Sequence, residues 1–117
     1  MKSQFLDLLH VSMIDDKTWV LDADMRYQSR ILGDVVTVPK GFTTNFASVP
    51  RLPLAYVFFG GVANQASTVH DYLYATHITT RYKADCIFRE AMALTNVSWI
   101  KRNLMWLGVR VYGGSHF

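Results

Sequence analysis

The spacing of apolar residues along the chain changes near its middle. Residues 17–27 (KTWVLDADMRY) alternate in part between apolar and polar side chains, which is typical of a strand with one buried face. The apolar face of this strand consists of Trp19, Leu21, Ala23, Met25 and Tyr27. A turn at Gly33-Asp34 precedes a second short strand at residues 35–38, which Pro39 ends. The two strands are predicted to form an antiparallel hairpin.

After Gly60-Gly61, apolar residues recur at intervals of three and four positions. Ser98 is placed to cap the last helix that this spacing indicates, and Gly113-Gly114 to end it. Short connections favour antiparallel packing of neighbouring helices. The spacing predicts three helices, at about residues 62–75, 82–95 and 99–111.

Between the strands and the helices lies a segment rich in turn-forming residues. Residues 42–50 (FTTNFASVP) contain Thr, Asn and Ser side chains that stabilise turns, so we expect an ordered loop. Residues 52–59 are apolar, which fits a buried helical turn or a strand. We therefore expect an α+β fold in a single domain over residues 1–117. It should have an N-terminal β-hairpin or small antiparallel sheet, an ordered loop and three C-terminal helices.

The composition limits the partners and the cellular compartment expected for the protein. Half of the residues are apolar and the mean hydropathy is +0.11, which suggests that a partner covers some apolar surface. Cys86 has no second cysteine to pair with, which fits a reducing compartment. The net charge of +3 comes without a basic run, so we expect no nucleic-acid partner. Neither a transmembrane segment nor a signal peptide is evident, so we expect synthesis in the cytoplasm without export.

The candidate chemistry centres on two predicted helices. His70 and Tyr74 share a helix face because they are four residues apart, and Asp71 is turned away from them. Asp85, early in the next helix, can reach His70 if the two helices pack antiparallel. A base oriented by a carboxylate would result. Two non-catalytic explanations fit the same residues equally well. His70 and Asp85 could form a buried structural hydrogen bond, or Asp85 could form an exposed ion pair with Arg89.

Two further groups of side chains have simpler interpretations. Met92, Trp99, Met105 and Trp106 lie at helical spacing and are expected to face the core or a partner. The basic residues most simply form a solvated face, from which some could pair with Asp71 or Asp85: Arg51, Arg81, Arg89, Lys101, Arg102 and Arg110.

Three motifs together resemble a phage and prophage family of unknown function, over roughly residues 19–113. They are the loop P-K-G-F-T-T-N-F-A-S-V-P-R at residues 39–51, H-D-Y-L-Y at 70–74 and A-D-C-I-F at 84–88. The family pattern has an acidic residue where this chain has Asn45. If that acid binds a metal or acts as a base, the resemblance implies that the activity is weakened or lost in this chain.

The helix motifs are also similar to the paired catalytic helices of secreted-type phospholipases A2. In that family the His activates water, the adjacent Asp binds calcium and the later Asp orients the His. The resemblance implies these roles for His70, Asp71 and Asp85 respectively. The chain departs from the family in two respects: the glycine-rich calcium loop is reduced to Gly60-Gly61, and the disulfide framework is absent.

Two functions of different classes follow. On the sequence we favour a virion protein, which forms part of a phage tail or particle, or a protein that acts in phage assembly. Its partners would be other phage proteins or further copies of the chain, bound through residues 52–59 or through Trp99, Met105, Trp106 and Tyr112. The alternative is a small hydrolase of a lipid or cell-envelope substrate. There His70 and Asp85 would be catalytic, and Asp71, Asn45 and Tyr74 would bind the substrate or a cation such as Ca²⁺.

Overall fold

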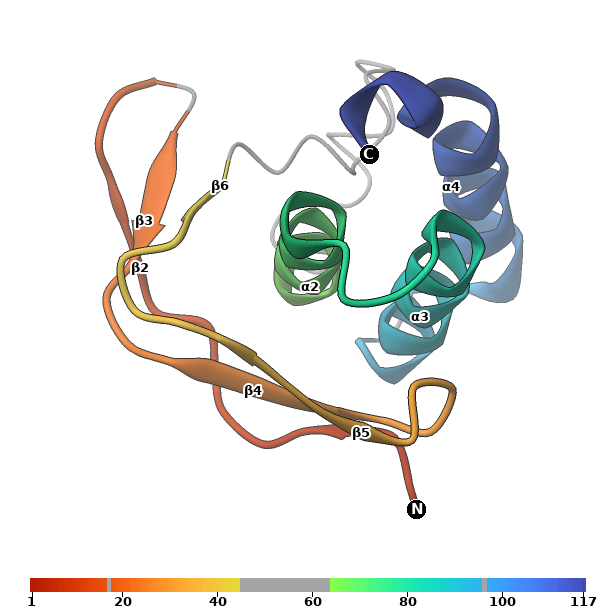
Figure 1. The fold of residues 1–117 in the computed structure, drawn as a ribbon, viewed down its shortest axis with the longest axis horizontal. Helices are drawn as coiled ribbons and strands as arrows, with labels where there is room; N and C mark the ends of the chain where they lie inside the picture. The colour runs from red at the N-terminus through yellow and green to blue at the C-terminus, as the bar shows by residue number, and fades with distance from the viewer. Residues whose placement is uncertain (17, 45–63, 96) are drawn as a thin grey trace.

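Strands occupy the N-terminal part of the chain and helices the C-terminal part, so the fold is α+β as expected. The computed structural model describes residues 1–16, 18–44, 64–95 and 97–117. Two small antiparallel sheets lie on one side of the molecule and three helices on the other, and the first two helices pack against the first sheet (Figure 1). None of the helices in these described ranges is long and apolar enough to cross a membrane.

The predicted hairpin is present and forms part of the first sheet. Its strands pair antiparallel with Tyr27 opposite Val36. The turn between them places Gly33 at a φ of 75°, a backbone conformation that favours glycine. In spatial order, the strands of this sheet are β1 (Gln4–Phe5), β4 (Met25–Ser29) and β5 (Asp34–Val38).

The second sheet overturns the prediction of one continuous strand over residues 17–27. That stretch forms two strands of different sheets, and the chain turns between them at residues 22–24. The carboxylates of the turn accept local hydrogen bonds: Asp22 from the Ser12 hydroxyl at 2.6 Å and Asp24 from the Lys40 amide at 2.7 Å. Ala23, expected on the buried face, is exposed. The second sheet contains β2 (Val11–Met13), β3 (Trp19–Leu21) and β6 (Thr43–Thr44).

The three helices begin and end within two residues of the predicted bounds. Thr80 caps the second helix and Ser98 the third, each accepting a hydrogen bond from the amide three residues on. A 3₁₀ turn, η1 (Gly113–His116), follows the last helix. The α-helices are α2 (Asn64–Thr76), α3 (Arg81–Leu94) and α4 (Trp99–Tyr112). Of the expected loop over residues 42–50 only residues 42–44 are described, and residues 52–59 lie outside the described ranges.

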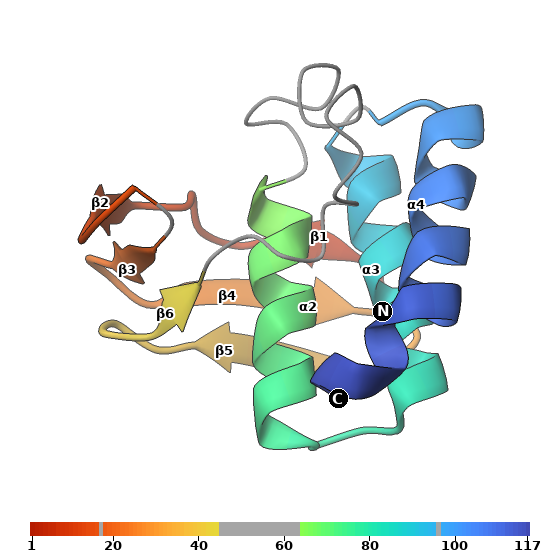
Figure 2. The same ribbon diagram turned by 90° about the horizontal axis from the view of Figure 1, so that it is seen from above.

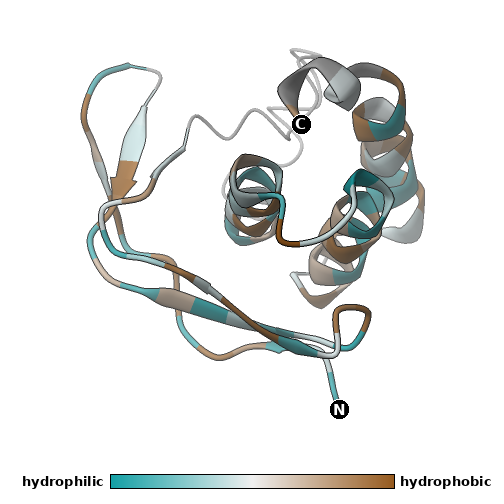
Figure 3. Ribbon diagram, viewed as in Figure 1, coloured by the Kyte–Doolittle hydropathy of each residue, from teal (hydrophilic) through white to brown (hydrophobic). Residues whose placement is uncertain are grey.

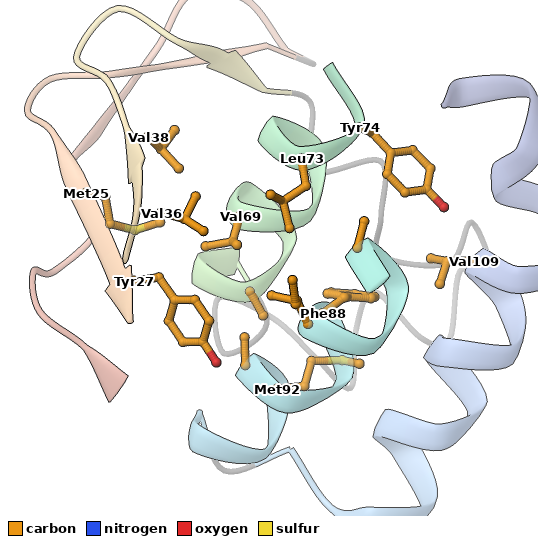
Figure 4. Close-up of a cluster of buried hydrophobic side chains, with 14 of the residues drawn as sticks. Met25, Tyr27, Val36, Val38, Val69, Leu73, Tyr74, Phe88, Met92 and Val109 are labelled. Carbon is orange, nitrogen blue, oxygen red and sulfur yellow. The ribbon is translucent and has the colours of Figure 1, made fainter. Parts of the chain in front are cut away.

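The core lies between the first sheet and the helices, and α3 packs between α2 and α4 (Figure 2). Apolar and polar residues alternate along the β4–β5 hairpin, which turns one face towards the helices (Figure 3). Side chains from the hairpin and all three helices meet there (Figure 4). The largest fully buried apolar side chains of the core are Leu21, Met25, Tyr27, Val36, Val38, Val69, Leu73, Ile87, Phe88, Met92 and Met105.

A single carboxylate attaches the hairpin to α3. Glu90 Oε1 accepts hydrogen bonds from the Tyr27 hydroxyl at 2.6 Å and the Ser29 hydroxyl at 2.9 Å. Its second oxygen accepts from the amide of Ile31 at 3.1 Å. The sheet is therefore held on the helical layer by hydrogen bonds as well as by apolar packing.

Candidate functional site

The hydrogen bond predicted between His70 and Asp85 is present. His70 Nε2 lies 2.7 Å from Asp85 Oδ1, and the two residues are only 2% and 0% exposed. The helices that carry them run antiparallel on either side of a short turn, so residues near that turn face each other. The His70 ring also stacks on Phe88, with 4.7 Å between ring centroids. Packing and the hydrogen bond together fix the orientation of the imidazole.

Tyr74 adds a second donor to the same carboxylate oxygen. It lies one helical turn after His70, and its hydroxyl donates to Asp85 Oδ1 at 2.5 Å. Burial, assisted by this hydrogen bond, raises the pKa of Tyr74 to about 12. The sequence placed Tyr74 among residues that bind a substrate or cation, whereas the structure shows its hydroxyl bound to Asp85.

The other oxygen of Asp85 is bound from the third helix. Arg110 Nη1 donates to Asp85 Oδ2 at 2.7 Å, which confirms that one of the basic residues pairs with this acid. Arg81 reaches back to α4, where its Nη2 donates to the carbonyls of Val109 at 2.8 Å and Arg110 at 2.6 Å. The expectation that Arg81 and Arg110 belong to a solvated face is wrong, since both are partly buried and bound.

The charge on Asp85 is set by competing effects. Burial alone would raise its pKa, but hydrogen bonds from His70, Tyr74 and Arg110 outweigh burial and hold the pKa of Asp85 below its ordinary value. The carboxylate is therefore ionised near neutral pH and acts only as an acceptor. The proton in its hydrogen bond with the imidazole then belongs to Nε2, so the neutral ring has its lone pair on Nδ1.

The alternative of an exposed pair between Asp85 and Arg89 is wrong. Asp85 is fully buried, and its ion pairs are with His70 and Arg110. Arg89 instead donates to Asn103 Oδ1 at 3.2 Å, and its guanidinium lies 4.4 Å from the ring centroid of Trp106.

Asp71 points to a different neighbour from His70. Its Oδ2 accepts a hydrogen bond from the hydroxyl of Thr44 in β6, and the adjacent Tyr72 packs edge-on against Phe42 at 5.4 Å between centroids. These contacts attach α2 to the chain just before Asn45, a candidate binding residue that lies outside the described residues.

Asp71 is the residue for which the phospholipase resemblance implies calcium binding. Calcium usually takes six to eight oxygens, and one carboxylate supplies two. Within residues 1–16, 18–44, 64–95 and 97–117, no group of three or more His, Cys, Asp or Glu side chains could hold a metal ion. The described donor set does not fit a calcium site, and the chemistry proposed below is that of the side chains alone.

The fold and the site thus define an α+β domain with a buried His–Asp pair between two antiparallel helices. The chain belongs to the family described as Protein of unknown function (DUF1353), which matches residues 19–109. That match contains every residue of the site except Arg110, which follows it directly. No curated protein and no solved structure matches the chain.

The roles of Arg110 and Arg81 in the site could not be predicted from the sequence. Tyr74 carried a usable signal, because a residue four positions after His70 on a helix must face the same neighbour. The signal for Arg110 was weaker. The sequence showed that Arg110 was one of several basic residues that could pair with Asp85, but not which of them does. Nothing in its spacing shows which way the third helix is rotated.

Proposed function

We propose that the His70–Asp85 pair is the general-base site of a small hydrolase, acting on an ester or amide of a lipid or cell-envelope molecule. The observation that carries the proposal is the 2.7 Å contact between His70 Nε2 and an ionised, fully buried carboxylate. A carboxylate in this position fixes the tautomer of the imidazole and stabilises the imidazolium that forms when the ring accepts a proton.

The reaction uses the His70 imidazole as the base, in the orientation that its contact with Asp85 gives it. As the ring takes a proton from water, the water oxygen forms a bond to the carbonyl carbon and the carbonyl electron pair moves to oxygen. When the tetrahedral intermediate collapses, the bond to the leaving oxygen or nitrogen breaks, and the imidazolium returns the proton to that atom. The products are an acid and an alcohol or amine, and His70 is regenerated in its neutral form.

Tyr74 and Arg110 act through Asp85 as positioning residues. The Tyr74 hydroxyl shares Oδ1 with His70, and Arg110 binds Oδ2, so rotation of the carboxylate would break at least two hydrogen bonds. These bonds also keep the carboxylate ionised, because they favour its charged form. The phospholipase resemblance supports the assignment of the same two roles, a base and its orienting acid, to His70 and Asp85.

A second candidate is the phage particle or assembly component favoured by the sequence. The burial of His70 and Asp85 supports this candidate. So do the hydrogen bonds that Asp85, on α3, accepts from His70 on α2 and from Arg110 on α4. In this function the polar network serves only to hold three helices together.

Hydrolysis assays on the purified chain distinguish the two candidates. The substrates are a short-chain nitrophenyl ester, phospholipid vesicles and peptidoglycan fragments, each tested with His70→Asn and with His10→Asn as the matched control. His10 is exposed, so its replacement should leave the rate unchanged, whereas His70→Asn should lower the rate at least about 100-fold. Circular dichroism on both variants checks that they are folded. Equal rates in the two variants, or no hydrolysis by a chain that is found in purified particles, would contradict the hydrolase and favour the second candidate.

A further inference from the structure

The outer face of α4 is apolar and uncovered, although its inner face already packs in the core. Met105 and Val109 on the inner face are 1% and 6% exposed. The outer side of α4 points away from α3 at the edge of the molecule (Figure 2). The exposed apolar residues of the helix are Trp99 (68%), Ile100 (64%), Leu104 (60%), Leu107 (51%) and Val111 (67%).

This placement changes the partner surface expected from the sequence. Trp99 is exposed as expected, but Met105 is buried and therefore cannot face a partner. Trp106 is partly buried beneath the guanidinium of Arg89. Ile100, Leu104 and Leu107 take their place on the outer face.

The spacing of the outer residues is that of a helix–helix seam. Ile100, Leu104, Leu107 and Val111 are separated by four, three and four residues, which is the repeat that faces a partner helix in a coiled coil. A flat or disordered partner would not require this repeat. The face therefore fits a helix, and the candidate helices include α4 of another copy.

We propose that α4 is the interface of a homodimer, in which it packs antiparallel against α4 of a second copy. The seam is self-complementary in this arrangement. With the two-fold axis between Leu104 and Leu107, each of these residues meets the other in the second copy, and Ile100 meets Val111. Such an isologous contact closes on itself and gives a dimer rather than a filament.

The charges beside the seam are compatible with this pairing. The flanking positions are occupied by Lys101, Asn103, Gly108 and Arg110, and α4 contains no acidic residue. In the antiparallel arrangement Lys101 lies across from Gly108 of the second copy, and Arg110 across from its Asn103. The basic residues therefore do not oppose each other directly.

The size of the face predicts a weak dimer. The four seam side chains are half exposed or more and represent roughly 400 Å² per copy, or about 800 Å² in total, which is the size of a weak contact. We expect a dissociation constant in the micromolar range. The inference goes beyond the proposed function and does not depend on His70 being a base.

Sedimentation velocity on the full chain, over concentrations on both sides of the micromolar range, tests the dimer. The wild type should pass from 13.4 kDa to twice that mass. The double variant Leu104→Glu/Leu107→Glu should stay monomeric. Ile14→Glu, which places the same charge at another exposed apolar residue (58%), should dimerise like the wild type.

A charge-pairing experiment tests the orientation of the two helices. Leu104→Glu mixed with Leu107→Lys should form a heterodimer, because antiparallel helices place these two positions opposite each other, whereas parallel helices place each position opposite itself. A wild type that stays monomeric throughout, or a dimer that survives the glutamate variant, would overturn the proposal. Binding of the monomeric wild type to anionic phospholipid vesicles, lost in the glutamate variant, would identify a lipid surface as the occupant and overturn it as well.

Discussion

His70 and Tyr74 lie one turn apart on α2 and contact the same oxygen of Asp85, at 2.7 Å and 2.5 Å. The other oxygen of this acid is bound by Arg110 from α4. Asp85 thus joins three helices at one buried point, and the same contacts orient the imidazole. A polar centre of this kind can serve both stability and chemistry, and substitutions of its members can distinguish the two.

Removing the carboxylate should destabilise the fold. Asp85→Ala leaves the His70 ring, the Tyr74 hydroxyl and the Arg110 guanidinium without their shared acceptor. We expect a loss of about 3 kcal/mol in the free energy of unfolding, measured by urea denaturation. Asp16→Ala, at an exposed position, is the control and should change stability little. A loss below about 0.5 kcal/mol for Asp85→Ala would mean that the network contributes nothing to the fold.

The stabilisation by Asp85 should depend on pH in a defined direction. Its pKa in the folded protein is lowered from an ordinary value of 3.8, so folding favours the ionised form. The contribution is complete above the unfolded pKa and is lost as the pH falls through the lower folded pKa. The stability difference between the wild type and Asp85→Asn should therefore narrow as the pH falls below about 4. A difference that widens below about pH 4 would contradict the assignment.

Tyr74 should titrate late and contribute modestly to stability. Because burial raises its pKa to about 12, folding favours the protonated hydroxyl, and this stabilisation is lost as the pH rises through that value. In an ultraviolet titration, Tyr74→Phe should remove part of the absorbance step at the highest pH. The same variant should cost about 1 kcal/mol at neutral pH. Tyr82→Phe, at a ring that is 57% exposed, should leave stability unchanged.

Glu90 should control the attachment of the hairpin. Glu90→Ala removes the acceptor of the Tyr27 and Ser29 hydroxyls and of the Ile31 amide. We expect about 2 kcal/mol of destabilisation and faster hydrogen exchange at the Ile31 amide. Unchanged exchange at Ile31 would show that apolar packing alone holds the hairpin on α3.

The sequence predicted the helices well and the strands only in part. A helix of thirteen or fourteen residues contains several turns, so its apolar period is readable, whereas β1 and β6 contain two residues each and have no period. Alternation correctly identified Leu21, Met25 and Tyr27 as inward-facing. It did not reveal the turn at residues 22–24, because Asp22 and Asp24 fit the polar face of a strand as well as they fit a turn.

The site was predictable where it depends on neighbouring helices. A short connection makes α2 and α3 antiparallel, and this alone brings His70 within reach of Asp85. The contact with Arg110 spans twenty-five residues and depends on the rotation of α4. That rotation was ambiguous, because α4 is apolar on two opposite faces and either could have been the buried one.

The most direct test of the proposed base is the position of the proton on the His70 ring. Long-range ¹⁵N–¹H NMR correlation on the neutral imidazole reports which nitrogen is protonated, and it requires no knowledge of the substrate. In the wild type we expect a proton on Nε2 and a lone pair on Nδ1, with this preference weakened in Asp85→Asn. A proton on Nδ1 in the wild type would mean that Asp85 does not accept from the ring, and the general-base proposal would fail.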